Sequence, residues 1–86
     1  MANFNFISDP GHSWLEVPME LVDRLGLRNK ISQYSYKSKI DGVEKAYLEE
    51  DFDAGLFIRA YGEDNVILIY VHLNEESEIR NFKRFK

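Results

Sequence analysis

Residues 66–71 form the longest uninterrupted apolar run in the chain, Val-Ile-Leu-Ile-Tyr-Val. β-Branched and aromatic residues favour strands, and a run of this length is shorter than an ordinary helix. A strand that is apolar at every position is typical of one covered on both faces or central in its sheet. The run therefore predicts a buried strand, for which the rest of the chain must supply neighbouring strands and a covering layer.

Two neighbouring strands are predicted near the N-terminus, over residues 3–8 and 12–17. The sequence Asp9-Pro10-Gly11 between them predicts a type II turn, because proline fixes the second position and glycine accepts the positive φ of the third. Alternation in the second strand places Leu15 and Val17 on one face and Trp14 and Glu16 on the other.

A second pair of strands is predicted over residues 31–36 and 44–49. Both segments alternate in the strand period, and Asp41-Gly42 between them is a strong hairpin signal. In the second strand Ala46 and Leu48 share one face, and Tyr47 lies on the other.

Two helices fit between these strands. Pro18 suits the first position of a helix that Gly26 ends, with Leu27 placed to close it. Asp51 or Asp53 is expected to cap a second helix, which Gly62 ends. The apolar face of the second helix would consist of Phe52, Leu56, Phe57 and Ala60.

The element order predicts a single α+β domain over residues 1–86. Its expected architecture is a two-layer sandwich with a mostly antiparallel sheet of about five strands (ββαββαβ), both helices on one face and a C-terminal tail. Ile79, Phe82 and Phe85 in this tail are spaced to pack one edge on the domain. An uncovered edge strand would favour a dimer.

Composition excludes several classes of site. The chain has no cysteine, so disulfides, thiolate zinc sites and thiol nucleophiles are excluded. No apolar run approaches the roughly 20 residues of a membrane span, and residues 1–8 carry no basic region followed by an apolar stretch. We therefore expect a cytoplasmic protein that contacts no membrane. The serines of the chain lie in no recognised catalytic motif.

Charge is divided into three blocks. Residues 1–48 carry six acidic and six basic side chains, residues 49–78 carry nine acidic side chains and Arg59, and residues 79–86 carry four basic ones. The basic tail, which contains Arg80, Lys83, Arg84 and Lys86, is a candidate for ionic contact with phosphate or an acidic protein. The alternative is that it folds back on the acidic block.

Carboxylates are concentrated at Glu49, Glu50, Asp51 and Asp53. Such a cluster could hold a hard cation such as Mg²⁺ through oxygen ligands. The favoured interpretation is one helix cap with solvated acids in the first turn, stabilised by the helix dipole. We therefore predict no metal and no cofactor.

His12 and His72 are the two histidines of the chain. Together with a nearby carboxylate they could form a metal site or an acid–base pair, which would suit a minimal metal-dependent enzyme acting on phosphate-containing substrates. Their spacing matches no recognised motif, and two independent surface histidines are the favoured interpretation.

Aromatic residues alternate on the predicted strands, at Trp14, Tyr34, Tyr36 and Tyr47. Beside Lys37, Lys39 and Lys45 an exposed set could stack unpaired bases, which would suit a single-stranded nucleic-acid-binding module. Core or cross-strand packing is the more usual role of such aromatics.

Four segments resemble a family of short uncharacterised proteins of bacteriophages and bacterial mobile elements: DPGHSWLEVP (9–18), ISQYSY (31–36), AYLEEDFDA (46–54) and HLNEESEIRNF (72–82). The resemblance implies a phage or host cytoplasmic setting and no assigned activity. It marks the following motif positions without giving any of them a role: His12, Trp14, Tyr34, Tyr36, Glu49, Glu50, Asp51, Asp53, His72, Asn74 and Arg80.

Size, segregated charge and the resemblance together indicate an accessory protein that binds a host or phage macromolecule, with inhibition as one form of that role. The expected contact surface comprises these motif positions together with Lys83 and Arg84. The metal-dependent enzyme and the nucleic-acid-binding module are the alternatives.

Overall fold

The computed structural model covers residues 1–86 and contains six strands and two α-helices. Neither α-helix is long and apolar enough to cross a membrane. In chain order the elements are β1 (Ala2–Ser8), β2 (Ser13–Pro18), α1 (Met19–Arg24), β3 (Tyr36–Ile40), β4 (Val43–Glu49), α2 (Ala54–Tyr61), β5 (Val66–His72) and β6 (Lys83–Arg84). Short 3₁₀ turns cover Arg28–Lys30, Glu63–Asn65 and Glu78–Asn81.

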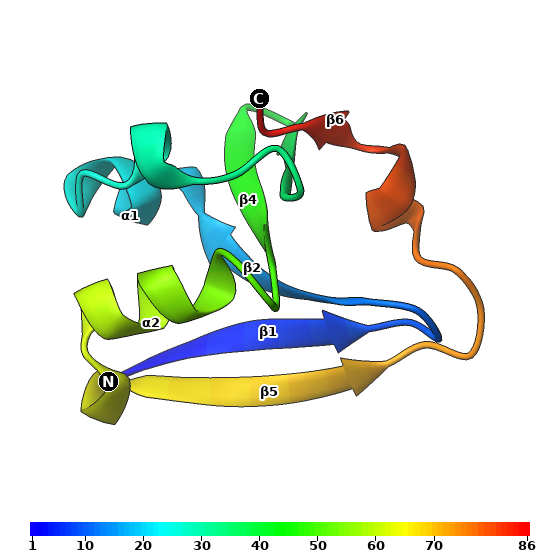
Figure 1. The fold of residues 1–86 in the computed structure, drawn as a ribbon, viewed down its shortest axis with the longest axis horizontal. Helices are drawn as coiled ribbons and strands as arrows, with labels where there is room; N and C mark the ends of the chain where they lie inside the picture. Colours follow the sequence, from blue (N-terminus) through cyan, green and yellow to red (C-terminus); the bar gives the residue numbers. More distant parts are fainter.

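The strands form one sheet in the order β5-β1-β2-β4-β3-β6 (Figure 1). Neighbouring strands are antiparallel except β1 and β5, which are parallel. The predicted α+β two-layer fold is therefore confirmed, with the short strand β6 added at one edge.

Both helices cover one face of the sheet, and the main core lies beneath them (Figure 1). Phe4 of β1 packs edge to face on Phe57 of α2, with ring centroids 5.4 Å apart. Leu15 and Val17 face this core as the alternation predicts, and Ala46 and Leu48 of β4 lie opposite them.

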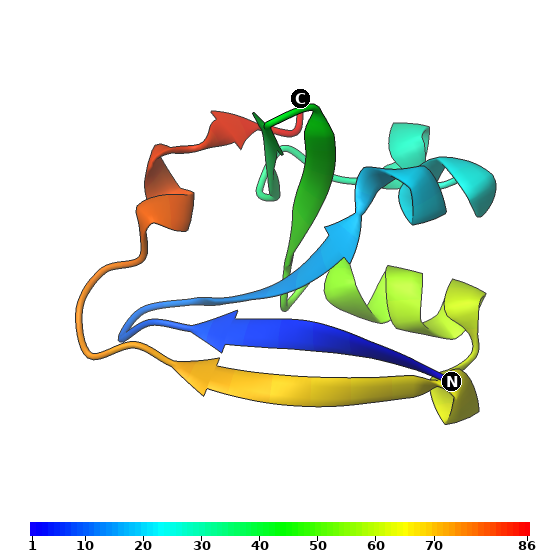
Figure 2. The same cartoon turned by 180° about the vertical axis from the view of Figure 1, so that it is seen from behind.

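Residues 73–82, which we call the C-terminal strap, leave β5 at one edge of the sheet and reach β6 at the other edge. The strap runs on the side away from the helices (Figure 2). Its Ile79 packs into a second buried cluster with Trp14, Tyr36 and Tyr47 from β2, β3 and β4. The strap therefore supplies a cover for the central part of the second sheet face.

Local signals for two chain reversals are confirmed. At the end of α1, the N–H groups of Gly26 and Leu27 donate to the carbonyls of Asp23 and Val22, with Gly26 at φ 70°. These are the two bonds of a Schellman helix ending. At the β3–β4 hairpin, Asp41 and Gly42 both have positive φ, as the favoured two-residue turn requires.

The prediction that residues 66–71 form a central or doubly covered strand is wrong. These residues do form a strand, but β5 is the edge of the sheet and several of its apolar side chains are exposed. Apolar content sets the strand tendency of a segment, whereas its place in the sheet depends on which distant segments pair with it.

The prediction of a strand over residues 31–36 is also wrong, because β3 begins only at Tyr36. A buried carboxylate holds the preceding loop in a non-strand conformation. Asp53 accepts hydrogen bonds from the backbone N–H and hydroxyl of Ser32 and from the hydroxyl of Ser35. These side-chain bonds compete with a strand ladder.

The turn at residues 9–12 joins β1 to β2 as expected, but Gly11 has no positive φ, so it is not the predicted type II turn. The Asp9 carboxylate accepts from the N–H groups of Gly11 and His12 instead. A Cβ on Gly11 would lie 2.7 Å from the Arg80 guanidinium, so a larger residue here would push that side chain away from its present position.

Candidate functional site

One pocket of about 430 Å³ gathers predicted contact residues from four segments that are distant in the sequence. We call it the aromatic–arginine pocket. Its volume lies within the range of small-ligand sites. Its lining residues are aromatic or ionisable: His12, Trp14, Tyr34, Tyr36, Glu49, Asp51, Phe52, Arg80 and Arg84.

Strand register brings the inner wall together. Trp14 of β2 is paired with Glu49 at the end of β4, and Tyr36 of β3 is paired with Arg84 of β6. Trp14 is only 2% exposed and its ring contacts the edge of Tyr36 at a centroid distance of 6.3 Å. The wall is therefore built on rigid strands, which hold a site more precisely than loops do.

Arg80 is fixed by a paired contact with Asp9. Its Nε and Nη2 donate to the two carboxylate oxygens at 2.7 and 2.8 Å, and the Asp9 side chain is fully buried. The guanidinium carbon lies 5.5 Å from the centre of the Trp14 ring, within reach of a cation–π interaction. Arg80 is thus held in a fixed orientation beside the tryptophan, and Nη1 is its guanidinium nitrogen that does not bind Asp9.

Glu49 supplies a negative group on the same wall. Its Oε2 accepts hydrogen bonds from the N–H groups of Asp51 and Phe52 at 2.8 and 3.1 Å. Burial raises the pKa of Glu49 above its ordinary value, opposed by the two N–H donors and supported by the nearby negative charges of Asp51 and Glu50. The carboxylate therefore orders the turn between β4 and α2.

The rim of the pocket is aromatic and open to solvent. Tyr34 and Phe52 stack with ring centroids 5.0 Å apart, although they are 47% and 59% exposed. On the same side Arg84 lies over the Tyr36 ring, 4.7 Å from its centre. Exposed rings beside an arginine offer a surface for planar or apolar groups of a partner.

Chemically, the pocket combines flat apolar surface with charges of both signs. The guanidinium groups of Arg80 and Arg84 can bind a carboxylate, while Glu49 and Asp51 can bind an amine or a guanidinium. Such a mixed set suits a polypeptide better than a polyanion.

Asp53 does not belong to this surface, so its prediction as a contact residue is wrong. It is 2% exposed and its carboxylate binds Ser32 and Ser35, as described above. It occupies the N-cap position of α2, yet its side chain makes no capping bond. The Asp53 carboxylate, which the sequence suggests as a helix cap, instead accepts hydrogen bonds from the loop 32–35.

Four other predicted contact residues lie outside the pocket. Glu50 is exposed next to it, and Asn74 is in the strap. His72 is at the exposed end of β5, and Lys83 is on β6 opposite Lys37. Thus eight of the thirteen predicted positions line one pocket.

Two residues of the site were missed. The sequence pattern predicts Phe52 on the buried face of the second helix, but this residue precedes α2 and stacks on Tyr34. The sequence pattern predicts only a turn role for Asp9, whose partner Arg80 is 71 residues away. A buried aspartate in a turn gives no local signal of such a distant partner.

Glu49, Glu50 and Asp51 are the one group of three acidic or histidine side chains whose oxygen or nitrogen ligand atoms lie within 4.8 Å of one another. The group contains neither histidine. His12 and His72 therefore do not form the shared centre that the metal-dependent enzyme requires.

No ion pair within 4.0 Å joins the acidic block to the basic tail, although the pKa of Arg80 is raised by its hydrogen bond with Asp9 and, to a smaller degree, by the negative charge of Glu76. No acid between residues 49 and 78 forms an ion pair within 4.0 Å, and Arg80 pairs with Asp9 from the first block. Arg84 and Lys86 donate instead to the backbone carbonyls of Gln33 and Asn29. Apart from the buried Glu49 and Asp53, the acids of residues 49–78 are exposed, and their charges are left for solvent or a partner.

Comparison with protein-family models, with curated proteins and with solved structures finds no match to this chain.

Proposed function

We propose that the chain is a small cytoplasmic accessory protein of a phage or mobile element that binds a host or phage protein through the aromatic–arginine pocket. The observation that carries this proposal is the convergence of eight predicted contact residues, seven motif positions and Arg84 of the basic tail, on one preformed pocket. Binding there would cover the surface of the partner, so inhibition of the partner is an expected consequence.

The composition of the pocket supports a protein partner. Tryptophan, tyrosine and arginine are the residues most enriched among those that dominate binding energy at protein interfaces. Here Trp14 forms the buried wall, Tyr34 the exposed rim, and Arg80 and Arg84 the flanks. In this arrangement a side chain of the partner would enter the pocket, and the aromatic rim around it would exclude water.

Preorganisation also supports a binding role. The Arg80 side chain is held by Asp9, and Glu49 is held by two N–H groups before any partner arrives. Ordering flexible side chains costs about 0.5–1.5 kcal/mol each on association. Side chains that are already ordered avoid most of this cost.

The test is site-specific photocrosslinking in the host cytoplasm. A photoreactive phenylalanine analogue replaces Phe52 on the pocket rim, and crosslinked proteins are identified by mass spectrometry. We expect one dominant protein partner, because this side chain is exposed and stacks on Tyr34 at the pocket rim. The purified partner should then bind the Tyr34→Ala/Arg84→Ala variant at least about tenfold more weakly.

The matched control places the same photoreactive group at Val43, which is also exposed but lies in the β3–β4 hairpin, outside the pocket. A second control is Lys39→Ala, a substitution of an exposed residue on β3. Equal crosslinking from Val43, or equal weakening by Lys39→Ala, would contradict the proposal.

Single-stranded nucleic acid is a second candidate, favoured by the exposed Tyr34–Phe52 stack beside Arg84. The wider stacking platform expected from the sequence is missing, because Trp14, Tyr36 and Tyr47 are buried under the strap. Anisotropy of a labelled oligonucleotide tests this candidate. It requires binding that weakens steeply with salt and is lost in Tyr34→Ala.

A further inference from the structure

The free edge of β5 is a second exposed surface, separate from the aromatic–arginine pocket. β5 pairs with β1 alone, so its outer side has no strand beside it. Native edge strands are usually protected by lysine, proline, a bulge or a covering element. Residues 66–71 contain none of the protective residue types, and no element lies beyond them (Figure 1).

Apolar side chains line one face of this edge. Ile67 and Ile69 are 44% and 45% exposed, and the register with Asn3 and Asn5 places them on the sheet face that carries the strap. The strap leaves the sheet at residue 73 and crosses beyond the end of β5, so it leaves these two isoleucines uncovered (Figure 2).

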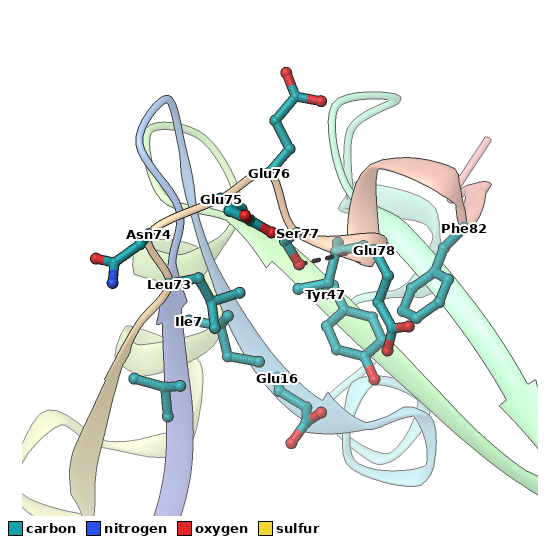
Figure 3. A pocket seen from close by; sticks show the side chains of 12 residues that line it. Ile7, Glu16, Tyr47, Leu73, Asn74, Glu75, Glu76, Ser77, Glu78 and Phe82 are labelled. Atoms are coloured by element: carbon teal, nitrogen blue, oxygen red, sulfur yellow. Dashed lines mark hydrogen bonds between the residues drawn. The ribbon is translucent and has the colours of Figure 1, made fainter.

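This apolar face continues into a hollow between β5 and the strap, which we call the glutamate groove. The groove has a volume of about 710 Å³. Figure 3 shows Ile7 and Leu73 at its centre and Phe82 at its far side, while Glu76 points away into solvent.

Glutamates supply the charge of the groove. Glu16 and Glu78 lie on either side of the Tyr47 ring (Figure 3). Burial raises the pKa of the Tyr47 hydroxyl, a hydrogen bond with Ser38 opposes this, and the negative charges of both glutamates add to the rise. The strap glutamates form no ion pair within 4.0 Å. Glu16 lies 4.0 Å from the Lys45 ammonium, so it is the strap glutamates that place negative charge without an ion-pair partner beside the apolar floor.

We propose that β5 accepts an extended segment of a partner protein as a seventh strand, with the lysine- or arginine-rich end of that segment in the glutamate groove. Strand addition would satisfy the outer backbone groups of β5, and alternate apolar side chains of the segment would cover Ile67 and Ile69. The unpaired glutamates provide charge complementarity to the basic end.

A second copy of this chain fits the same edge poorly. Antiparallel pairing of two β5 strands would bring the groove end of each strand toward the start of the other. That start is preceded by the exposed acids Glu63 and Asp64. Like charges would then face each other at both ends of the interface.

The test selects peptide ligands from a random library, so the amino-acid sequence of the partner segment need not be known. A library of random linear peptides is panned against the whole chain, and binding of selected labelled peptides is measured by fluorescence anisotropy. We expect peptides that alternate apolar residues and carry lysine or arginine at one end. Bound peptide should also slow amide hydrogen exchange along β5.

Two variants test the two halves of the surface. Ile69→Lys places a charge on the exposed edge and should abolish peptide binding. The triple variant Glu75→Gln/Glu76→Gln/Glu78→Gln should weaken it about tenfold and reduce its salt dependence. The control Glu63→Gln/Asp64→Asn removes exposed acids outside the groove and should leave affinity unchanged.

The proposal is overturned if no peptide is enriched, or if the enriched peptides bind Ile69→Lys normally. It is also overturned if sedimentation shows a dimer that Ile69→Lys dissociates, since the occupant would then be a second copy. The outcome is independent of the proposed pocket function, because Tyr34→Ala/Arg84→Ala should retain peptide binding.

Discussion

Asp9 connects more of the molecule than any other single residue of the candidate site. Its carboxylate accepts from the turn N–H groups of Gly11 and His12, from the N–H of Ser77 in the strap, and from Arg80. The Arg80 guanidinium holds the pKa of Asp9 well below its usual range; burial opposes this, and the three N–H donors support it. One carboxylate therefore joins the first turn to the strap.

We predict that Asp9→Asn destabilises the protein by about 2 kcal/mol at neutral pH, because one acceptor oxygen and the charge are lost. A depressed folded pKa gives stability that is present above the unfolded value of about 3.9 and is lost as pH falls toward the folded value. The difference in free energy of unfolding between wild type and Asp9→Asn should therefore become smaller below about pH 4. Urea unfolding across pH measures it.

Glu63→Gln serves as the control for this experiment, since Glu63 is exposed and makes no ion pair within 4.0 Å. A difference between wild type and Asp9→Asn that stays constant from neutral pH to pH 3 would contradict the assigned role of the Asp9 charge.

At the scale of elements, the strap decides which aromatic residues the protein exposes. It covers Trp14, Tyr36 and Tyr47 with Ile79, which is 3% exposed. Without this cover, a row of aromatic rings from three strands would face solvent. The strap also carries Arg80 to the pocket, so the pocket and the second core depend on one segment.

We predict that Ile79→Ala lowers the free energy of unfolding by about 3 kcal/mol, since it leaves a cavity among well-packed aromatic rings. The one tryptophan of the chain, Trp14, lies in this cluster, so its emission should shift to longer wavelength as water approaches. Chemical unfolding followed by fluorescence measures both effects.

Ile40→Ala is the matched control, because Ile40 is 60% exposed. It should change stability by less than about 0.5 kcal/mol and leave the emission unchanged. Similar effects of the two substitutions would show that the strap is only loosely packed on the sheet.

Elements set by local chemistry could be predicted from the sequence. The Asp41-Gly42 hairpin and the Gly26 helix ending depend on residues within a few positions, and both are confirmed. The errors arose where a distant segment decides. Asp53 holds the loop 32–35 out of the sheet. β5 pairs only with β1, and this pairing places β5 at the edge of the sheet.

Most residues of the candidate site could be predicted from the sequence, but their convergence on one pocket could not. Eight lining positions were named, yet their convergence depends on the register of Trp14 with Glu49 and on the contact of Arg80 with Asp9. Neither the strand register nor the Arg80–Asp9 contact can be predicted from the residues near it in the sequence. Phe52 was missed because its apolar character fits a buried helix face equally well.

At the scale of the whole molecule, unpaired negative charge is the dominant electrostatic feature. Nine acids lie between residues 49 and 78, and none of them forms an ion pair within 4.0 Å. Seven of these acids are exposed; their mutual repulsion opposes the compact state, and dissolved salt screens it.

We therefore predict that raising potassium chloride from low to physiological ionic strength increases Tm by about 4 °C. The triple variant Glu75→Gln/Glu76→Gln/Glu78→Gln should show a smaller rise, because much of the repulsion is already removed. Differential scanning calorimetry measures both. A Tm that falls with salt would indicate that favourable ion pairs outweigh the repulsion.

The parallel pairing of β1 with β5 also governs how the protein can fold during synthesis. β1 emerges first, but one of its two neighbours is residues 66–72, and Phe85 must enter the main core before that core is closed. Sheets dominated by such long-range contacts form slowly. The nascent chain therefore exposes its apolar strands until these late residues are available, and this interval is when it is most prone to aggregation.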